Sequence, residues 1–407
     1  MGKAKSHGFS KARLQRIDQF LQDKYVGPGR MPCAQFVLAR GGEVVHQSVL
    51  GQQDPERGVA LAEDTVFRLY SMTKPVASVA LMTLVEEGLV ALDDPVAKHI
   101  PEWANLGVFN AGVGPYLTTA PARPMQVVDL LRHTSGLTYG FQNRSNVDAA
   151  YRKLKLADHH GDDDLEGMIQ QLAKLPLEFS PGEAWNYSVS TDVVGYLVQK
   201  LCGKPLDQAL QERIFDPLKM EDTGFHVRGD QRGRFAACYN AMTDGKMKLQ
   251  DDPAKSPYLE PPKLLSGGGG LVGTAADYLK FATMLTNGGE LDGVRILAPK
   301  TLKLMTANHL PGGQDLTQLS RSLFSESTNA GIGFGLGFAT VFDAPQTLIP
   351  CSNGEFYWGG AASTAFWCDP LEDITAVFMT QLLPSSTYPI RRELRTLVYS
   401  ALTESNG

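Results

Sequence analysis

The sequence predicts an α/β fold in which one mixed sheet is built from both ends of the chain and a helical domain is inserted between its halves. Strand-like segments occur early, at residues 34–39 and 44–49. Residues 72–260 read mostly as helices and loops, and strand-like segments return at 333–341, 355–358, 363–368 and 374–379. Strands at both ends with helices between them indicate this arrangement.

Each terminal element has its own signal. Residues 9–24 place Leu14, Ile17, Phe20 and Leu21 on one side of a helix. The first two strands are joined by a tight turn at 40–43, which contains two glycines. Residues 65–70 read as an extended approach to an apolar helix that Gly88 ends, and a final helix is expected at 389–402.

The order of these elements predicts two domains. Residues 1–71 and 265–407 are expected to form the α/β sheet domain, and residues 72–264 the mainly helical domain. A cleft between two domains is a usual place for a substrate pocket, so we expect the active site there.

Composition narrows the function classes. The net charge of −6, without a basic block, argues against a nucleic-acid surface. The longest apolar runs are too short to span a bilayer, and the N-terminus does not resemble a secretory signal. The five cysteines are scattered, without a C-x-x-C pair, and read as reduced structural thiols. A cytoplasmic location is therefore expected.

The sequence Ser71-Met72-Thr73-Lys74 carries the strongest chemical signal. Residues three apart face the same way on a helix, so the Lys74 amine would lie beside the Ser71 hydroxyl and could activate it as a nucleophile. The position at a helix N-terminus favours developing negative charge, and the N–H of Ser71 could form half of an oxyanion hole. The structural alternative is a capping serine with a solvated lysine.

Two further segments are candidates for the same site. Tyr187 lies where a loop meets a helix that starts near Thr191, and its phenol could share a proton with a lysine. It could equally be a tyrosine that packs a helix start. Residues 358–361 join two short strands through small residues, and the N–H of Ala361 could complete the oxyanion hole. The alternative there is an ordinary bulge or hairpin.

Other motifs are assigned structural roles. Residues 267–270 are glycine-rich but lack the Gly-Lys-Ser/Thr of a phosphate loop. His159 and His160, followed by three aspartates, could suggest a metal site but are interpreted as a solvated loop. His133 is interpreted as a helix-ending structural histidine, because the chain has no G-x-S-x-G elbow for a Ser-His-Asp triad.

Taken together, the Ser71/Lys74 pair, the Tyr187 motif and the glycine-rich strand near 360 resemble the serine β-lactamase and penicillin-binding-protein superfamily. The sequence is most similar to class C β-lactamases and family VIII carboxylesterases. Segments 67–75, 87–95, 130–137, 181–183 and 267–271 extend the resemblance over nearly the whole chain. It implies a class C β-lactamase-like fold, with a mostly antiparallel sheet flanked by helices.

Two departures from the class C pattern bear on function. Val189 stands where those enzymes have the Asn of Tyr-x-Asn, and Trp358-Gly359-Gly360 replaces Lys-Thr-Gly. The resemblance implies that the missing lysine would have met a β-lactam carboxylate. Both changes therefore favour neutral, partly apolar substrates, and they are similar to family VIII esterases.

The resemblance implies two-step hydrolysis of carboxylic esters, with short to medium acyl chains, through a Ser71 acyl-enzyme. Lys74 and Tyr187 would act as general base and acid, with the choice of formal base left open. The N–H groups of Ser71 and Ala361 would form the oxyanion hole, and Trp358, Gly359 and Gly360 would contact the substrate.

The expected partner is a small-molecule ester, with no metal, organic cofactor, nucleic acid or membrane span; the oligomeric state is open. The alternatives are an acyltransferase of the statin-synthase type, β-lactamase or D-amino-acid peptidase activity, and a non-enzymatic scaffold. Intact Ser71, Lys74 and Tyr187 argue against the scaffold, since it would need none of them.

Overall fold

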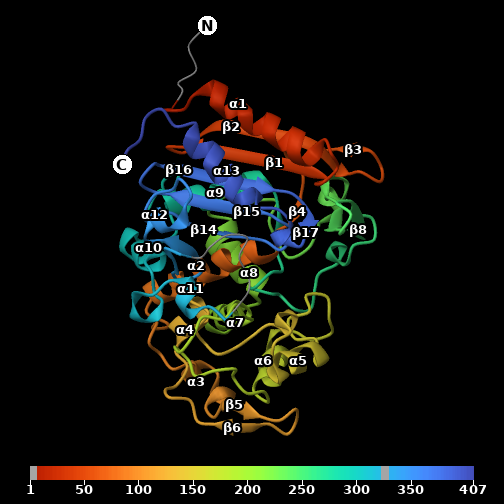
Figure 1. Cartoon of the computed structure of the whole chain (residues 1–407). Coiled ribbons are helices and arrows are strands. Elements are labelled where there is room, and N and C mark those ends of the chain that lie inside the picture. The colour runs from red at the N-terminus through yellow and green to blue at the C-terminus, as the bar shows by residue number, and fades with distance from the viewer. Residues whose placement is uncertain (1–6, 322–329) are drawn as a thin grey trace.

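A computed structural model describes residues 7–321 and 330–407. Among these residues, eight strands form one sheet in the order β12-β13-β14-β15-β16-β1-β2-β3. Every pair of neighbours in that sheet is antiparallel. The sheet is therefore built from the first 60 residues and from residues after 331, as the sequence predicts, and the predicted fold class is confirmed (Figure 1).

The strands of this sheet are β1 (Cys33–Arg40), β2 (Glu43–Asp54), β3 (Val59–Ala60), β12 (Ile332–Phe334), β13 (Ala339–Val341), β14 (Phe356–Gly359), β15 (Ala365–Asp369) and β16 (Ile374–Met379). The predicted strand at 374–379 has the bounds of β16. The single strand predicted at 333–341 is wrong. A turn closed by the N–H of Gly335 donating to the Phe338 carbonyl (2.8 Å) divides it into β12 and β13, and Gly337 supplies the φ of 102°.

Both faces of the sheet are buried at the central strands β1 and β16, where alternate residues point to opposite sides. Phe36 and Phe378 pack in one cluster with α1 (Lys11–Leu21) and α13 (Ile390–Ser400), two helices from opposite ends of the chain that lie side by side (Figure 1). Val37 and Val377 point to the other face, which α9 (Ala275–Thr286) covers. The period of two along each strand produces this division.

The remaining helices are α2 (Thr73–Glu86), α3 (Val96–His99), α4 (Val127–Leu131), α5 (Asn146–Lys153), α6 (Leu165–Leu172), α7 (Ser190–Cys202), α8 (Leu206–Leu210), α10 (Pro299–Thr306), α11 (Leu316–Leu319) and α12 (Ala344–Thr347). Short strand pairs are β4 (Phe67–Arg68) with β9 (Val272–Gly273), β5 (Val108–Ala111) with β6 (Leu117–Thr119), and β10 (Glu290–Leu291) with β11 (Val294–Arg295). A further small sheet joins β17 (Leu382–Leu383), β7 (Cys238–Ala241) and β8 (Met247–Asp251).

Helices α2 and α7 pack together between the sheet and the helices α3, α5 and α6, which lie at the opposite end of the molecule from α1 (Figure 1). Residues 73–84 of α2 are all buried, which explains its almost uniformly apolar sequence. The division into domains at residues 71/72 and 264/265 stays a prediction.

Two global observations bear on the sequence predictions. All five cysteines are free thiols. Within the two described ranges, no helix combines the length and apolar character needed to cross a bilayer.

Candidate active site

Ser71 lies in a strained turn that connects the sheet side of the molecule to α2. Strand β4 ends at Arg68, whose fully buried guanidinium is held by Asp251 and the Ala236 carbonyl. The extended segment predicted to run through residue 70 stops there, because Tyr70 has a φ of 45°, which a non-glycine residue rarely adopts. A 3₁₀ turn, Tyr70–Met72, then leads into α2 and places Ser71 on the wall of a cavity.

Lys74 is buried one turn later and faces three oxygen atoms. Its Nζ donates to the Ser71 hydroxyl at 3.4 Å, to the Tyr139 hydroxyl at 2.9 Å and to the Gly268 carbonyl at 2.7 Å. Three donated hydrogen bonds use all the protons of an ammonium group. The structure thus brings Lys74 beside Ser71, as the i, i+3 spacing predicts, and holds it with two groups that the sequence analysis did not single out.

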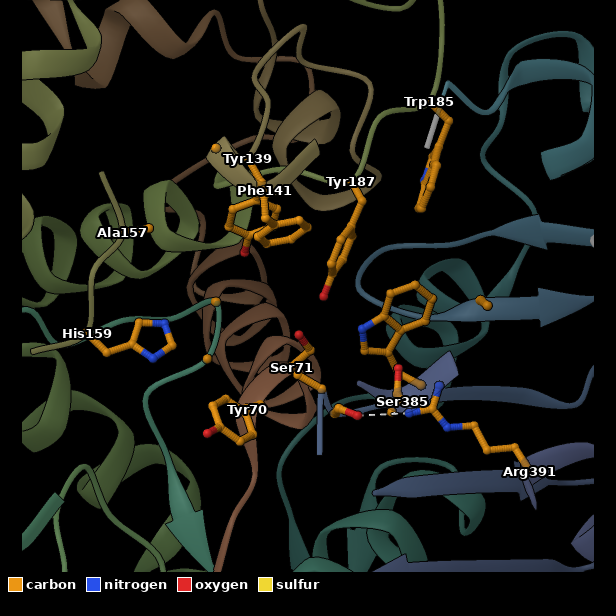
Figure 2. A pocket seen from close by; sticks show the side chains of 18 of the residues that line it. Tyr70, Ser71, Tyr139, Phe141, Ala157, His159, Trp185, Tyr187, Ser385 and Arg391 are labelled. Carbon is orange, nitrogen blue, oxygen red and sulfur yellow. Dashed lines mark hydrogen bonds between the residues drawn. The ribbon is translucent and has the colours of Figure 1, made fainter. Parts of the chain in front are cut away.

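Tyr187 enters the same site from the segment before α7. Its ring lies between those of Tyr139 and Trp358, with centroid separations of 5.4 and 5.5 Å. Lys74 Nζ is 4.5 Å from the Tyr187 ring centroid, and the Tyr187 hydroxyl points toward the Ser71 side chain (Figure 2). The structure therefore brings Ser71, Lys74 and Tyr187 together.

His133 lies behind Tyr187, just after α4. Its ring centroid is 5.0 Å from that of Tyr187, and its Nδ1 is 3.3 Å from the Ser188 hydroxyl. Burial, with a smaller contribution from the nearby Lys74 charge, holds its pKa well below the usual range. The neutral ring is a packing element after α4, in agreement with the structural role predicted for it.

The glycine motif places Ala361 next to the Ser71 turn. After β14, the N–H of Gly360 donates to the Thr364 carbonyl at 3.0 Å, which makes a tight turn into β15. A Cβ built on Gly360 would lie 2.4 Å from the Leu69 carbonyl oxygen, so this backbone packs directly on the segment that precedes Ser71. Trp358, Gly359, Gly360 and Ala361 all line the cavity.

Arg391 of α13 supports this turn from the far side. Its Nη2 donates to the carbonyls of Gly360 and Thr364, at 2.9 Å each. A Cβ on Gly359 would lie 2.5 Å from the Arg391 Cζ, so the glycine makes this approach possible. Helix α13 therefore supports the same turn that packs on the segment before Ser71.

For the ester hydrolysis that the family resemblance implies, we expect Gly360→Ala to lower kcat on the order of 10- to 100-fold. The added methyl would meet the Leu69 carbonyl at 2.4 Å and the Thr364 hydroxyl at 2.3 Å, so the turn that carries Ala361 must move. Steady-state kinetics check this. Gly229→Ala is the matched control, because no atom lies within 4 Å of its added methyl. Equal kcat values for the two variants would contradict the importance of this close approach.

The cavity has a volume of about 810 Å³, within the range that accommodates small organic ligands. Aromatic rings form much of its wall, among them those of Tyr139, Phe141, Trp185 and Tyr187 (Figure 2). Trp358 also lines the cavity. Such a wall suits an apolar substrate moiety.

Residues 159–164 form neither helix nor strand, and Asp162, Asp163 and Asp164 are exposed, as the loop prediction expects. His159 departs from that prediction in one respect: its side chain is half-buried, lines the cavity and packs on Gly269, where a Cβ would lie 2.6 Å from the imidazole Cε1. Burial lowers the pKa of His159 to about 4. The negative charge of Asp192 opposes this shift, whereas the positive charge of Lys74 adds to it. His159 is therefore a neutral ring at physiological pH. Among the described residues, no cluster of metal-ligating side chains occurs.

The geometry has a definite chemical capability. A serine hydroxyl at the start of a helix lies against the buried Lys74 side chain, the Tyr187 hydroxyl points toward it, and a strand end of small residues lies alongside. Nucleophile, proton carriers and backbone donors are the components of acyl transfer.

Comparison with known proteins agrees with this geometry. The model of the beta-lactamase family matches residues 15–400. The chain belongs to the beta-lactamase family. Protein Rv1367c of Mycobacterium tuberculosis is 38% identical over 339 residues, which cover 82% of each chain.

The chain is also similar to proteins whose descriptions name an activity. Esterase EstB of Burkholderia gladioli is 29% identical and aligns with 96% of this chain and 95% of its own. The solved structure of EstCE1, described as a hydrolase with promiscuous acyltransferase activity, has a TM-score of 0.80 and is 27% identical. It covers 95% of this chain and 98% of its own.

Proposed function

We propose that this member of the beta-lactamase family is a serine hydrolase that cleaves carboxylic esters through a Ser71 acyl-enzyme. The observation that carries the proposal is the contact between Lys74 Nζ and the Ser71 hydroxyl inside a cavity with an aromatic wall. Trp358 in that wall presents an apolar ring where a class C enzyme would present a cation. An uncharged ester is the substrate class that fits such a wall.

In the acylation step, the Ser71 oxygen attacks the ester carbonyl carbon, and its proton passes to the Lys74/Tyr187 unit. Backbone N–H groups of Ser71 and Ala361 stabilise the oxyanion. When the tetrahedral intermediate collapses, the bond to the alcohol oxygen breaks, and the same unit returns the proton to the leaving alcohol.

Deacylation repeats these roles with water. The Lys74/Tyr187 unit takes a proton from a water molecule while the water oxygen attacks the acyl carbon. The bond from that carbon to the Ser71 oxygen then breaks, and the unit returns the proton to Ser71. Each bond formed to the acyl carbon is matched by one broken, so the cycle consumes one ester and one water. No metal or organic cofactor enters any step.

The substrate we propose has a short to medium acyl chain and no carboxylate beside the scissile bond. The aromatic wall formed by Phe141, Tyr187 and Trp358 favours apolar groups. The description of EstB as an esterase supports the reaction class, because it aligns with almost the whole of this chain.

A paired assay with p-nitrophenyl butyrate and a chromogenic cephalosporin tests the proposal. We expect ester turnover, with cephalosporin opening at least about tenfold lower in kcat/KM, because no Lys-Thr-Gly lysine meets the β-lactam carboxylate. Faster opening of the cephalosporin than of the ester would identify a β-lactamase instead. If neither substrate is turned over, the proposed hydrolysis is contradicted and a transferase becomes the favoured function.

Acyl transfer to an alcohol is the second candidate function. It is favoured by the similarity to EstCE1, which is described as having promiscuous acyltransferase activity, and by apolar walls that can exclude water from the acyl-enzyme. Adding a primary alcohol to the p-nitrophenyl butyrate reaction and measuring butyrate ester by chromatography distinguishes the two. Free butyrate as the sole product would leave hydrolysis as the function.

A further inference from the structure

The inference concerns the environment of Lys74 and rests on the proposed function. Tyr139, 65 residues away in sequence, accepts a hydrogen bond from Lys74 Nζ at 2.9 Å, which is shorter than the 3.4 Å contact between Lys74 and Ser71. Lys74 Nζ also lies 5.2 Å from the centroid of the Tyr139 ring. Tyr139 therefore holds the Lys74 side chain through a hydrogen bond to its phenolic oxygen.

Tyr139 keeps its phenolic proton. Burial raises its pKa well above the ordinary value, and the charges of Asp192 and Tyr187 raise it further. A neutral phenol accepts a hydrogen bond from an ammonium without taking its proton. Tyr139 is thus suited to fix the position of Lys74 and unsuited to act as a base.

A buried carboxylate lies behind this pair. Asp192, in the first turn of α7, is fully buried, and its Oδ1 accepts from the Ser266 hydroxyl (2.5 Å) and the Gly268 N–H (3.0 Å). Its other oxygen, Oδ2, is buried with no hydrogen-bond partner in the described part of the chain. A Cβ built on Gly268 would lie 2.6 Å from that oxygen and 3.0 Å from the Tyr139 hydroxyl, so both groups border the same glycine.

Gly268 connects these groups to Lys74. Its N–H donates to Asp192, and its carbonyl accepts from Lys74. A residue with a side chain at this position would separate Asp192 from Tyr139 and displace one of them. This explains why a glycine is present at position 268: the side chains of Asp192, Tyr139 and Lys74 all approach it closely.

We propose that Tyr139 and Asp192 are positioning residues of the catalytic site: Tyr139 fixes the Lys74 ammonium against Ser71, and Asp192 supplies the compensating buried charge through Gly268. This arrangement meets the electrostatic requirement of a buried ammonium, which needs both hydrogen-bond acceptors and a nearby negative charge. It also accounts for how Lys74 is held when Val189 offers no side-chain amide.

The test is the pH profile of kcat/KM for p-nitrophenyl butyrate with Tyr139→Phe and Asp192→Asn. Tyr139→Phe removes the acceptor oxygen, and we expect kcat to fall about 10- to 100-fold with KM changed by less than about threefold. Asp192→Asn keeps an oxygen for Ser266 and Gly268 but removes the charge. We expect it to lower kcat less, on the order of threefold to tenfold.

Both variants weaken the ammonium form of Lys74, so the limb of the profile that reports Lys74 should move to lower pH. That is the acid limb if the neutral amine is the base, and the alkaline limb if the ammonium is required while Tyr187 is the base. A purely structural defect would lower the active fraction, measured by fluorophosphonate labelling, and leave both limbs in place.

Tyr196→Phe is the matched control. Tyr196 lies on the same helix as Asp192 and does not line the cavity. The substitution removes only the hydroxyl that donates to Glu166. Wild-type kinetics are expected. If Tyr139→Phe keeps the wild-type kcat and both limbs, or if kcat falls only with the labelled fraction, the inference is overturned. Absence of Ser71 labelling in the wild type would instead contradict the proposed function.

Discussion

The Ser71→Ala variant should lose ester hydrolysis by at least about 10³-fold in kcat while it folds like the wild type. The covalent step needs the Ser71 oxygen, and among the described serines only the Ser71 hydroxyl is hydrogen-bonded to Lys74 Nζ. Folding should persist because Lys74 keeps its hydrogen bonds to Tyr139 and Gly268, and Ser71 is only partly buried. Steady-state kinetics with thermal unfolding monitored by circular dichroism check both halves of this expectation.

Covalent labelling makes the assignment specific. A fluorophosphonate probe should add once to the wild type, on the peptide that contains Ser71, and should not add to Ser71→Ala. Ser78→Ala is the matched control on the same helix, because its hydroxyl is buried without a hydrogen-bond partner in the residues described. It should keep full activity and labelling. Full labelling of Ser71→Ala would show that another residue is the nucleophile.

Sequence reasoning succeeded where the signal is local. The strand at 374–379 alternates between two buried clusters, and the Ser71/Lys74 pair depends only on helical geometry. The strand predicted at 333–341 failed because its glycines allow a turn. The apolar residues of this segment fit one strand, but the positive φ of Gly337 interrupts the extended backbone.

The parts of the site that could not be predicted depend on long-range contacts. Tyr139 is one of thirteen tyrosines, and nothing near it in sequence marks it as a partner of Lys74. The Gly268 carbonyl is a backbone group, and glycine runs predict close approach without naming what approaches. The half-burial of His159 was not predicted for a related reason. The charged residues that follow it are exposed, as expected, but tertiary packing brings this ring against Gly269.

Replacing Lys74 should have an effect as large as replacing Ser71. We expect Lys74→Met to lower kcat at least about 10³-fold. The variant lacks the amine of the Lys74/Tyr187 unit, which removes the proton from Ser71 and returns it to the alcohol. Stability should also fall. Leaving the Gly268 carbonyl without its donor costs about 1–3 kcal/mol, and the buried Asp192 loses the positive charge that it compensates, which adds to this cost. Kinetics and thermal unfolding measure the two effects separately.

Lys74→Arg decides what the lysine contributes. A guanidinium keeps the positive charge but does not give up its proton at any accessible pH, so it cannot act as a base. If Lys74 is the base, Lys74→Arg should be as inactive as Lys74→Met and should react equally slowly with the fluorophosphonate. If Lys74→Arg retains more than about a tenth of wild-type kcat while Lys74→Met does not, the requirement is for a cation. Tyr187, whose ring centroid lies 4.5 Å from Lys74 Nζ, is then the base, because its hydroxyl points at Ser71 and a neighbouring cation stabilises a phenolate.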